Sequence, residues 1–328
     1  MLTLVTGGNG FVGRAIVERL LARGDRVRVV GRGDYPELVA MGVEVVRADL
    51  GDPGANPALA RAMAGVEVVF HVAAKAGGLG GSFVEYYRNN VTATQRVVRA
   101  AEKAGVPKLV FTSSPSVVIG DEDLAGADES TPYPARYLHP YPATKALAER
   151  FVLARTGLAT VAIRPHLVWG LRDPHILPRF LALARAGRLI RIGDGTNMVD
   201  ITYVENAAEA HLLAADALGE RSPLRGRAYF IGQERPVNAW EFINELVTRA
   251  GCRPVTRSVP RGVAMAVATV AEATHAALHL PGEPFLSRFV VAEITSTHWF
   301  DHSAARRDFG YEPRISIEEG LRRTFTES

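Results

Sequence analysis

A tyrosine and a lysine four positions apart give the chain its clearest candidate for chemistry. They are Tyr141 and Lys145, in the stretch Tyr-Pro-Ala-Thr-Lys. Side chains at this spacing lie on one face of a helix, so the Lys145 ammonium can sit beside the Tyr141 phenol. A free phenol titrates near pH ~10, and a neighbouring positive charge lowers that pKa by stabilising the phenolate. The pair can therefore serve as a tuned general acid and base, unless it merely decorates a surface helix.

Three glycines follow the first apolar segment of the chain. Residues 2–5 have the character of a buried strand, and Gly7, Gly10 and Gly13 come directly after it. Apolar residues then recur with the period of a helix. Glycines at these positions permit a tight turn, close approach of backbone N–H groups to a pyrophosphate, and close packing of helix on strand. The pattern favours a dinucleotide-binding turn over an ordinary loop with spare glycines.

The elements that must position these residues alternate between strand and helix. The predicted strands span residues 2–5, 27–30, 43–46, 66–72, 109–114 and 159–164. A long helix is predicted at 83–104 and another at Tyr141 to Lys145. Such alternation predicts a parallel sheet with right-handed crossovers and helices on both faces. The expected fold class is therefore α/β, a doubly wound Rossmann sheet.

The regular alternation weakens beyond residue 165. Helices are predicted near 175–187, 204–217 and 239–250, and strand-like segments at 189–192, 199–203 and 228–231. We expect a dinucleotide-binding domain at 1–169 and a smaller, mainly substrate-binding domain at 170–328, with about 199–232 returning to the core sheet. The apolar helix at 263–280 is short and carries Glu272, which argues against a membrane span. A core or substrate-gate helix is favoured over a membrane-surface helix.

Several side chains stand where predicted strands end, the edge at which open α/β sheets bind ligands. Ser114 offers a hydroxyl there, although serines at strand ends are often only turn formers. Asp49 can accept a hydrogen bond from an adenine amino group or simply start a turn. Ala73 and Ala74 are small enough to let the backbone approach a flat cofactor, whereas His71 is expected to pack rather than react.

Composition excludes several classes of protein. The 38 Lys and Arg residues exceed the 35 Asp and Glu residues by three and are scattered among them, so no nucleic-acid-binding stripe is visible. The single cysteine, Cys252, cannot form an intrachain disulfide. Strand-like sequence from Leu2 leaves no room for a signal peptide. We expect a cytoplasmic protein with no nucleic-acid partner and no metal site.

The end of the second predicted strand bears on cofactor choice. NAD-selective sites place an acid there, which accepts from the ribose 2′-hydroxyl and repels a 2′-phosphate. This chain has Gly31 followed by Arg32, whose guanidinium can fork onto phosphate oxygens. NADP(H) is therefore predicted over NAD(H). In the alternative, Arg32 points to solvent and Asp34 replaces the missing acid.

Seven motifs in order resemble the extended short-chain dehydrogenase/reductases over nearly the whole chain. They are TGGNGFVG at 6–13, ADL at 48–50, HVAA at 71–74, NNV at 89–91, FTSS at 111–114, YPATK at 141–145 and RP at 164–165. The resemblance implies that Tyr141 is the general acid and base, that Lys145 tunes it and binds the ribose, and that Ser114 hydrogen-bonds the carbonyl oxygen. It also implies that Asn90 supports the proton relay and that Asp49 holds the adenine. Other cofactor-binding residues that the motifs imply are Gly7, Gly10, Phe11, Val12, Gly13, Leu50, Ala73, Ala74, Lys75 and Pro165. The family's habit also implies a homodimer.

Beyond the core, the chain resembles the 3β-hydroxysteroid and sterol-carboxylate dehydrogenase branch, and most of all the 2-alkyl-3-oxoalkanoate reductases of bacterial long-chain olefin synthesis. The stretches that carry this resemblance are residues 73–77, 115–117, 164–170, 173–175, 199–208 and 305–311. Ala93 departs from the glycine that is frequent at its position, which should alter helix packing rather than chemistry. The implied reaction interconverts a ketone and a secondary alcohol on a bulky apolar substrate, either a 2-alkyl-3-oxoalkanoic acid or a 3β-hydroxysteroid.

The expected substrate pocket has apolar walls. The helix at 263–280 and the side chains of Leu79, Phe83, Tyr86 and Tyr87 are candidates to form it, next to a glycine-rich loop at 75–82. His166 is a candidate to meet a substrate carboxylate. A nucleotide-sugar epimerase or dehydratase is the alternative, because it shares the core motifs. A nucleotide-sensing regulator without turnover is disfavoured, since it would not need Ser114, Tyr141 and Lys145 together.

Overall fold

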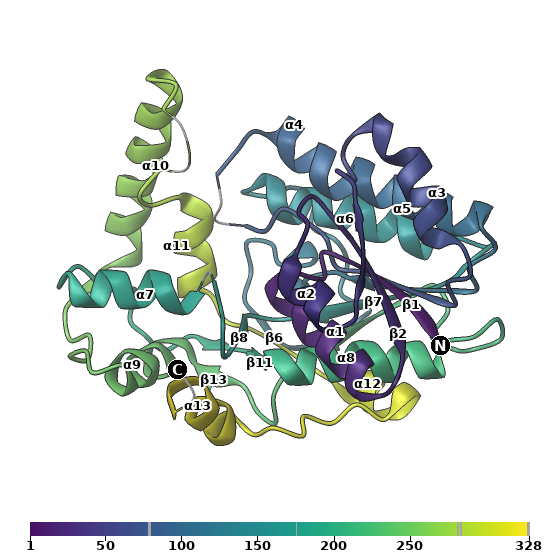
Figure 1. The fold of residues 1–328 in the computed structure, drawn as a ribbon. Helices are drawn as coiled ribbons and strands as arrows, with labels where there is room; N and C mark the ends of the chain where they lie inside the picture. Colours follow the sequence, from purple (N-terminus) through teal and green to yellow (C-terminus); the bar gives the residue numbers. More distant parts are fainter. Residues whose placement is uncertain (78–79, 175, 281, 283, 327–328) are drawn as a thin grey trace.

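The computed structural model of the chain describes residues 1–77, 80–174, 176–280, 282 and 284–326. Its centre is a parallel sheet of seven strands in the order β12-β7-β5-β4-β1-β2-β3 (Figure 1). The strands are β1 (Leu2–Thr6), β2 (Arg26–Gly31), β3 (Glu44–Arg47), β4 (Val68–His71), β5 (Lys108–Thr112), β7 (Ala159–Pro165) and β12 (Arg227–Ile231). The strand order reverses between β1 and β4, so a crevice opens beyond their carboxyl ends. The predicted doubly wound Rossmann fold is confirmed.

Helices cover both faces of this sheet, and each face has its own apolar cluster. The helices α1 (Phe11–Ala22), α8 (Val204–Ala217) and α12 (Ser303–Phe309) cover one face. The other face is covered by α3 (Asn56–Met63), α5 (Ala93–Lys103) and α6 (Pro140–Leu153). Because both faces are covered, β4 and β7 are buried along their whole length, which explains why they read as continuous apolar runs.

Two predicted elements are interrupted in the structure. The helix expected at 83–104 consists of α4 (Phe83–Tyr86), a π-helical turn η2 (Tyr87–Thr92) and α5. The strand expected at 109–114 ends at Thr112, because Pro115 begins a short 3₁₀ turn, η3 (Pro115–Val117), directly after it. Both interruptions lie beside the crevice, where a π turn re-aims the side chains that it carries.

The remaining elements form a smaller lobe around short strands. Two of its sheets have two strands each: β8 (Val168–Trp169) pairs with β11 (Thr202–Tyr203), and β9 (Arg191–Ile192) pairs with β14 (Ser258–Val259). A third sheet has four strands, in the order β13 (Val237–Asn238), β10 (Met198–Val199), β15 (His298–Phe300) and β6 (Leu124–Ala127). The helices are α7 (Ile176–Arg185), α9 (Ala239–Arg249), α10 (Arg261–Ala277), α11 (Arg288–Thr295) and α13 (Ile317–Thr326), while α2 (Pro36–Ala40) stands beside the large sheet. Strand β6 pairs with β15 although the two lie far apart in sequence. The division of the chain at residues 169 and 170 stays a prediction.

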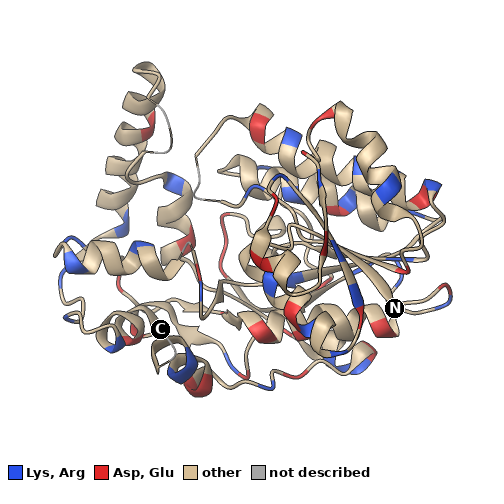
Figure 2. Ribbon diagram, in the orientation of Figure 1, with Lys and Arg blue, Asp and Glu red and all other residues tan. Residues whose placement is uncertain are grey.

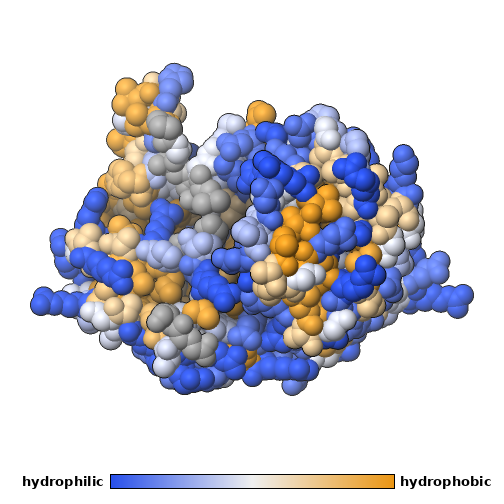
Figure 3. All heavy atoms as spheres, in the orientation of Figure 1, coloured by the Kyte–Doolittle hydropathy of each residue, from blue (hydrophilic) through white to orange (hydrophobic). Residues whose placement is uncertain are grey.

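Helix α10 is not a core helix, which was one of the two roles that its apolar sequence suggested beside that of a substrate gate. It projects from the smaller lobe, and only Ala264 and Ala268 are buried in it (Figure 1). Val263, Val267 and Val270 are exposed. The projecting part of the molecule has an apolar surface (Figure 3). No helix within the described part of the chain is long and apolar enough to cross a membrane. Basic and acidic side chains are interspersed over both lobes (Figure 2).

A buried ion pair joins α6 to the central sheet. The Arg164 guanidinium on β7 donates to both oxygens of Glu149, at 2.6 and 3.0 Å, and the two side chains are 4% and 0% exposed. The Tyr133 hydroxyl donates to the same carboxylate at 2.6 Å. Glu149 lies one and two helical turns after Lys145 and Tyr141 on the same face of α6. The pair therefore fixes the rotation of the helix that carries both candidate residues.

Replacing Arg164 by Met is expected to lower the free energy of unfolding by about 3–5 kcal/mol, because the Glu149 carboxylate then stays buried without its cation. The double variant Glu149→Leu, Arg164→Met should recover part of that loss. The exposed pair of Arg249 with Glu245 supplies the control, since Arg249→Met should cost at most about 1 kcal/mol. Urea unfolding measures all three. Equal costs for Arg164→Met and Arg249→Met would contradict this account.

Candidate active site

The glycine turn between β1 and α1 is too tight for any other residue at two of its positions. Gly7 has φ +70°, and a Cβ there would lie 2.9 Å from the backbone nitrogen of Ala73. A Cβ on Gly13 would overlap the Gly7 carbonyl oxygen. Gly10 donates its N–H to that same oxygen at 2.9 Å and begins α1. The first turn of α1 therefore points its free N–H groups into the crevice.

A fourth glycine, Gly8, is needed for packing and was not singled out by sequence reasoning. A Cβ on Gly8 would lie 2.5 Å from a methyl of Val29 on β2. The position of Gly8 within the glycine motif at 6–13 is the sequence signal that could have identified it. The turn is thus pressed against both neighbouring strands, which brings its backbone close to anything bound above it.

The segment after β4 is held by a chain of buried hydrogen bonds. The Thr6 hydroxyl accepts from the N–H groups of Val72 and Ala73, both at 3.2 Å. The His71 ring lies between Thr6 and Thr94, at 2.7 and 2.8 Å from their hydroxyl oxygens. Burial lowers the pKa of His71 to about 3, so the ring is neutral. His71 packs, as predicted, and it orders the backbone on which Ala73 and Ala74 line the crevice.

Asn90 reaches this same segment from the π-helical turn. Its amide oxygen accepts from Lys75 N–H at 2.7 Å, and its amide nitrogen donates to the Lys75 carbonyl and to the Thr144 hydroxyl, both at 3.1 Å. The side chain is buried and does not line the crevice. Asn90 therefore fixes the cofactor-side loop relative to α6, while its place in a proton relay stays a prediction. The Lys75 ammonium is paired with Glu85 at 2.7 Å.

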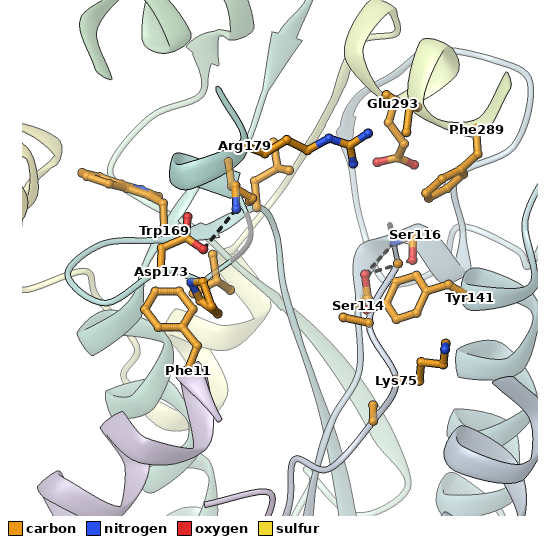
Figure 4. Close-up of a pocket in the computed structure, with 18 of the residues that line it drawn as sticks. Phe11, Lys75, Ser114, Ser116, Tyr141, Trp169, Asp173, Arg179, Phe289 and Glu293 are labelled. Atoms are coloured by element: carbon orange, nitrogen blue, oxygen red, sulfur yellow. Dashed lines mark hydrogen bonds between the residues drawn. The ribbon is translucent and has the colours of Figure 1, made fainter. Parts of the chain in front are cut away.

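Ser114 and Tyr141 meet on one wall of the pocket (Figure 4). The Ser114 hydroxyl lies 2.9 Å from that of Ser116 and accepts from Ser116 N–H at 3.3 Å. Burial raises the pKa of Tyr141, a hydrogen bond with Ser114 opposes the rise, and the nearby Glu293 carboxylate adds to it. Sequence reasoning missed Ser116, although its motif follows Ser114 directly.

Lys145 is buried and does not use its ammonium on the tyrosine in this cofactor-free chain. Its Nζ donates to the Thr112 carbonyl at 2.5 Å and lies 4.2 Å from the centre of the Phe111 ring. Burial lowers the pKa of Lys145 to about 7, although Glu149 opposes the change. The expected lowering of the Tyr141 pKa by Lys145 is therefore not what this arrangement produces. The fold instead keeps an amine that titrates near neutral pH one turn away from the phenol.

At the opposite end of the crevice, Asp49 forms the turn that was one of its two predicted uses, and it also lines the crevice. Its carboxylate accepts from Gly51 N–H at 3.0 Å, which is the turn-forming use, and it lines the crevice beside Leu50. It also pairs with Arg88 at 2.7 Å. The adenine role of Asp49 stays a prediction.

The end of β2 carries a residue that sequence reasoning missed. The Tyr35 ring lies over the backbone, so a Cβ on Gly31 or on Gly33 would come within 2.5 and 2.6 Å of it. Arg32 is exposed and lines the same end of the crevice. Asp34, the alternative acid, lies 3.6 Å from Arg47 and is absent from the described lining. No acid from β2 therefore faces this end.

The substrate side of the pocket is apolar, but its walls differ from those expected. Phe83, Tyr86 and Tyr87 are not among the described residues that line it, and Leu79 lies outside the described residues. Tyr86 is buried and donates to the Ala76 carbonyl at 3.0 Å, whereas the rings of Phe83 and Tyr87 contact each other at the surface in a tilted arrangement. Helices α7, α9, α10 and α11 form the wall instead, with the aromatic side chains of Phe180, Phe242 and Phe289, and Phe285 joins them from the loop between α10 and α11. The expected contribution of the helix at 263–280 is confirmed by Val263, Ala264 and Val267.

The expected role of His166 as the partner of a substrate carboxylate is not supported by its surroundings. Its Nε2 lies 2.6 Å from Nδ1 of His298, and burial together with His298 and His302 lowers its pKa well below the usual value. A neutral ring with its nitrogen already engaged offers no charge to an anion.

The crevice and the apolar pocket form one cavity of about 1530 Å³. This exceeds the roughly 300–1,000 Å³ of a site for one small ligand, so a cofactor and a substrate fit together. The glycine turn, which Cβ atoms would fill, fits a dinucleotide pyrophosphate, and the crevice runs from there to Ser114, Tyr141, Lys145 and Pro165. Within the described residues, no group of three His, Cys, Asp or Glu side chains could hold a metal ion.

Comparison with known proteins agrees with this geometry. The sequence model of the 3-beta hydroxysteroid dehydrogenase/isomerase family matches residues 4–261. The chain belongs to this family. It is therefore an NAD(P)-dependent oxidoreductase of the extended short-chain dehydrogenase/reductase type. Its likeness continues beyond the matched segment in individual proteins of the family.

Two curated relatives and one solved structure illustrate the likeness. The chain is 44% identical to the 2-alkyl-3-oxoalkanoate reductase of Stenotrophomonas maltophilia, covering 98% of both chains. It is 33% identical to the human sterol-4-alpha-carboxylate 3-dehydrogenase, decarboxylating, covering 98% of this chain and 86% of the human one. The UDP-glucose 4-epimerase of Thermus thermophilus, solved with NAD, is 27% identical with a TM-score of 0.74 over 99% and 98% of the two chains.

Replacing Lys145 by Met is expected to stabilise the cofactor-free protein near neutral pH. The unfolded lysine keeps its proton up to a pKa of 10.5, whereas the folded one loses it near 7, so the unfolded state binds more protons between these values. The cost of burying Lys145 is therefore complete below pH 7 and disappears as the pH rises towards 10.5. The advantage of the Met variant should shrink by up to about 1.4 kcal/mol per pH unit in that window.

Urea unfolding at about pH 6, 8 and 9.5 measures this advantage. The lost bond to the Thr112 carbonyl offsets part of it equally at each pH. The exposed Lys103 is the matched control, because Lys103→Met should differ from the parent by the same small amount throughout. An advantage of Lys145→Met that stays constant or grows with pH would show that the lysine is not buried in its neutral form.

Proposed function

We propose that this protein is an NADP(H)-dependent reductase that interconverts the 3-oxo and 3-hydroxy forms of a bulky apolar acid of the 2-alkyl-3-oxoalkanoic type. The observation that carries the proposal is the position of Ser114 and Tyr141 between the dinucleotide crevice and a large apolar pocket. The pocket wall is made by four helices of the smaller lobe. A long alkyl chain matches such a wall, because its burial is favourable in proportion to the apolar area removed from water.

The side chains around the reacting carbon have distinct tasks in this proposal. When bound, the nicotinamide supplies or accepts a hydride. Tyr141 gives its hydroxyl proton to the substrate oxygen during reduction and takes it back during oxidation. Ser114 donates a hydrogen bond to the same oxygen, which is most negative at the transition state. Lys145 places its amine one helical turn from Tyr141 and binds the cofactor ribose in this proposal, and Asn90 holds the loop at Lys75 and helix α6 in register.

The relatives' names support the choice of substrate. A 2-alkyl-3-oxoalkanoate and a sterol 4-carboxylate that is oxidised at position 3 both carry a carboxylate on the carbon next to the reacting one. A 3β-hydroxysteroid substrate of the same kind is therefore the second reading of this pocket. A nucleotide-sugar epimerase or dehydratase is the runner-up, since a related epimerase shares the fold, but the predominantly apolar wall suits a sugar diphosphate poorly. The homodimer and the cytoplasmic location stay predictions.

A turnover panel tests this proposal. We expect the purified protein to oxidise long-chain 2-alkyl-3-hydroxyalkanoic acids with NADP⁺, followed by the absorbance of the reduced cofactor. The panel also contains 3β-hydroxysteroids with and without a 4-carboxylate, and UDP- and dTDP-sugars. Tyr141→Phe should lower kcat by about 10²- to 10⁴-fold. The exposed Tyr87→Phe is the matched control and should keep the parent rate. Turnover of the sugars alone would sink the proposal.

The preference for NADP(H) rests on the end of β2. Arg32 lines the crevice with an exposed guanidinium, and within the described residues it has no ion-pair partner. The acid that could oppose a 2′-phosphate, Asp34, is drawn to Arg47. A fork of charge-assisted hydrogen bonds from Arg32 to the phosphate would therefore meet no competing carboxylate from this strand.

Replacing Arg32 by Ala should weaken NADPH binding by roughly ten- to a hundredfold, because one charge-assisted contact is worth about 1.5–3 kcal/mol. NADH binding should change little. Fluorescence titration of the parent and the variant with each cofactor gives the four affinities. Arg26→Ala removes an exposed arginine at the opposite end of β2, outside the cavity lining, and should leave the ratio of affinities unchanged. Equal affinities of the parent for both cofactors, or an equal loss of both in Arg32→Ala, would rule out the preference.

A further inference from the structure

Helix α7 turns an apolar face towards the pocket, and one charged residue interrupts it. Ile176, Arg179, Phe180 and Leu183 all line the cavity, at the i, i+3, i+4 and i+7 spacing of a single helical face. Asp173 fixes the start of this helix by accepting from the N–H groups of Ile176 and Leu177, at 3.1 and 2.8 Å. The orientation of this face is therefore set by a buried cap, and Arg179 lies one turn into the helix.

The guanidinium of Arg179 extends across the pocket towards Glu293 (Figure 4). Within the described residues, no hydrogen bond or ion pair occupies it. Glu293 is in turn the charged residue on the pocket-facing side of α11, among Phe289, Val290 and Ile294. The two helices thus place opposite charges on facing apolar walls without closing them into an ion pair. A gap of this kind suits a small anionic group beside an alkyl chain.

The position of the gap between Arg179 and Glu293 relative to Ser114 and Tyr141 bears on which group of a substrate could enter it. Glu293 is near enough to Tyr141 to affect its pKa, and Figure 4 places it on the same side of the pocket as Ser116. In a 3-oxo acid the carboxylate is attached to the carbon next to the reacting one. When the substrate oxygen meets Ser114 and Tyr141, the carboxylate must therefore lie close to these residues, on the side away from the cofactor.

Other cations that line the cavity are engaged or lie elsewhere. Lys75 pairs with Glu85, and Lys145 donates to the Thr112 carbonyl. Arg32 lies at the end of β2, on the adenosine side of the crevice. Arg188 is nine residues beyond Arg179, past the end of α7, and Arg257 directly precedes β14. Arg179 is thus the cation that Figure 4 shows among the residues around Ser114 and Tyr141 on the substrate side.

We propose that Arg179 is the specificity-determining residue that binds the substrate carboxylate and so selects acids over neutral ketones and alcohols of the same shape. This inference rests on the proposed function. A guanidinium offers two parallel N–H donors that match a carboxylate. The Arg179 side chain is exposed, which leaves these donors open to a ligand that enters the pocket. Glu293 repels a bound anion less than a fully ionised carboxylate would. Burial raises the pKa of Glu293, although the nearby His298 and His139 act in the other direction.

The test compares a stable acid with its own methyl ester. A 2-alkyl-3-hydroxyalkanoic acid and its ester are oxidised with saturating NADP⁺ by the parent and by Arg179→Gln. We expect the KM for the acid to rise about tenfold or more in the variant, with kcat little changed, because the lost contact holds substrate and transition state alike. The KM for the ester should stay within about twofold. Arg185→Gln removes an exposed arginine of the same helix that does not line the cavity and should change neither value.

A double variant separates carboxylate binding from simple neutralisation of Glu293. If Arg179 serves only to balance Glu293, then Arg179→Gln combined with Glu293→Gln restores the parent KM for the acid, and the proposal is wrong. If Arg179 binds the carboxylate, the KM for the acid stays raised in the double variant. If Arg188→Gln loses the preference for the acid and Arg179→Gln keeps it, the carboxylate binds at Arg188 and the assignment to Arg179 is wrong.

The results for the parent protein distinguish a failure of the Arg179 proposal from a failure of the proposed function. A parent that oxidises the acid well, together with an Arg179→Gln variant whose KM rises equally for acid and ester, refutes the role of Arg179 and leaves the proposed function standing. A parent that turns over neither acid nor ester, but accepts sugars or neutral steroids, refutes both.

Discussion

The ion pair between Glu149 and Arg164 determines how α6 sits against the central sheet, and the reactive end of the pocket depends on it. Tyr141, Lys145 and Glu149 follow one another along one face of this helix. The carboxylate that anchors the face in the core thereby aims the phenol at Ser114. On β7 the next residue is Pro165, which lines the crevice. One contact between two buried charges therefore sets the reactive wall and an adjoining part of the cofactor wall together.

Around that wall, burial pushes three ionisable groups towards their neutral forms. It lowers the pKa of Lys145 and raises those of Tyr141 and Glu293. Near neutral pH this lowers the stability of the fold at Lys145 and Glu293, which are charged in the unfolded chain, but not at Tyr141, whose phenol is neutral in both states. In return, the pocket has few charges that compete with those of a bound ligand. A low density of charge is what lets a single guanidinium, or a single hydroxyl, discriminate between ligands.

Sequence reasoning recovered what is encoded by short fixed spacings and failed where distant segments meet. The glycine turn, the strand ends and the tyrosine–lysine spacing each lie within one element and its loop, so the fold class and most crevice residues were predictable. Phe83 and Tyr87 were assigned to the substrate pocket wrongly, because they contact each other at the surface instead. His166 does line the pocket, but its ring is engaged by His298, a residue far away in sequence. Ser116, Tyr35 and Arg179 were missed, since their contact with the site arises only when loops and helices are placed in space.

Tyr35 also restricts how cofactor choice can be re-engineered in this fold. Its backbone has φ 45°, in the left-handed region that non-glycine residues rarely adopt, and its ring fills the space above Gly31 and Gly33. An acid introduced at Gly31 to create an NAD-type site would collide with that ring. The ring must then move, so a switch of coenzyme is coupled to the position of Tyr35, and pairing the acid with a smaller residue at Tyr35 removes the collision.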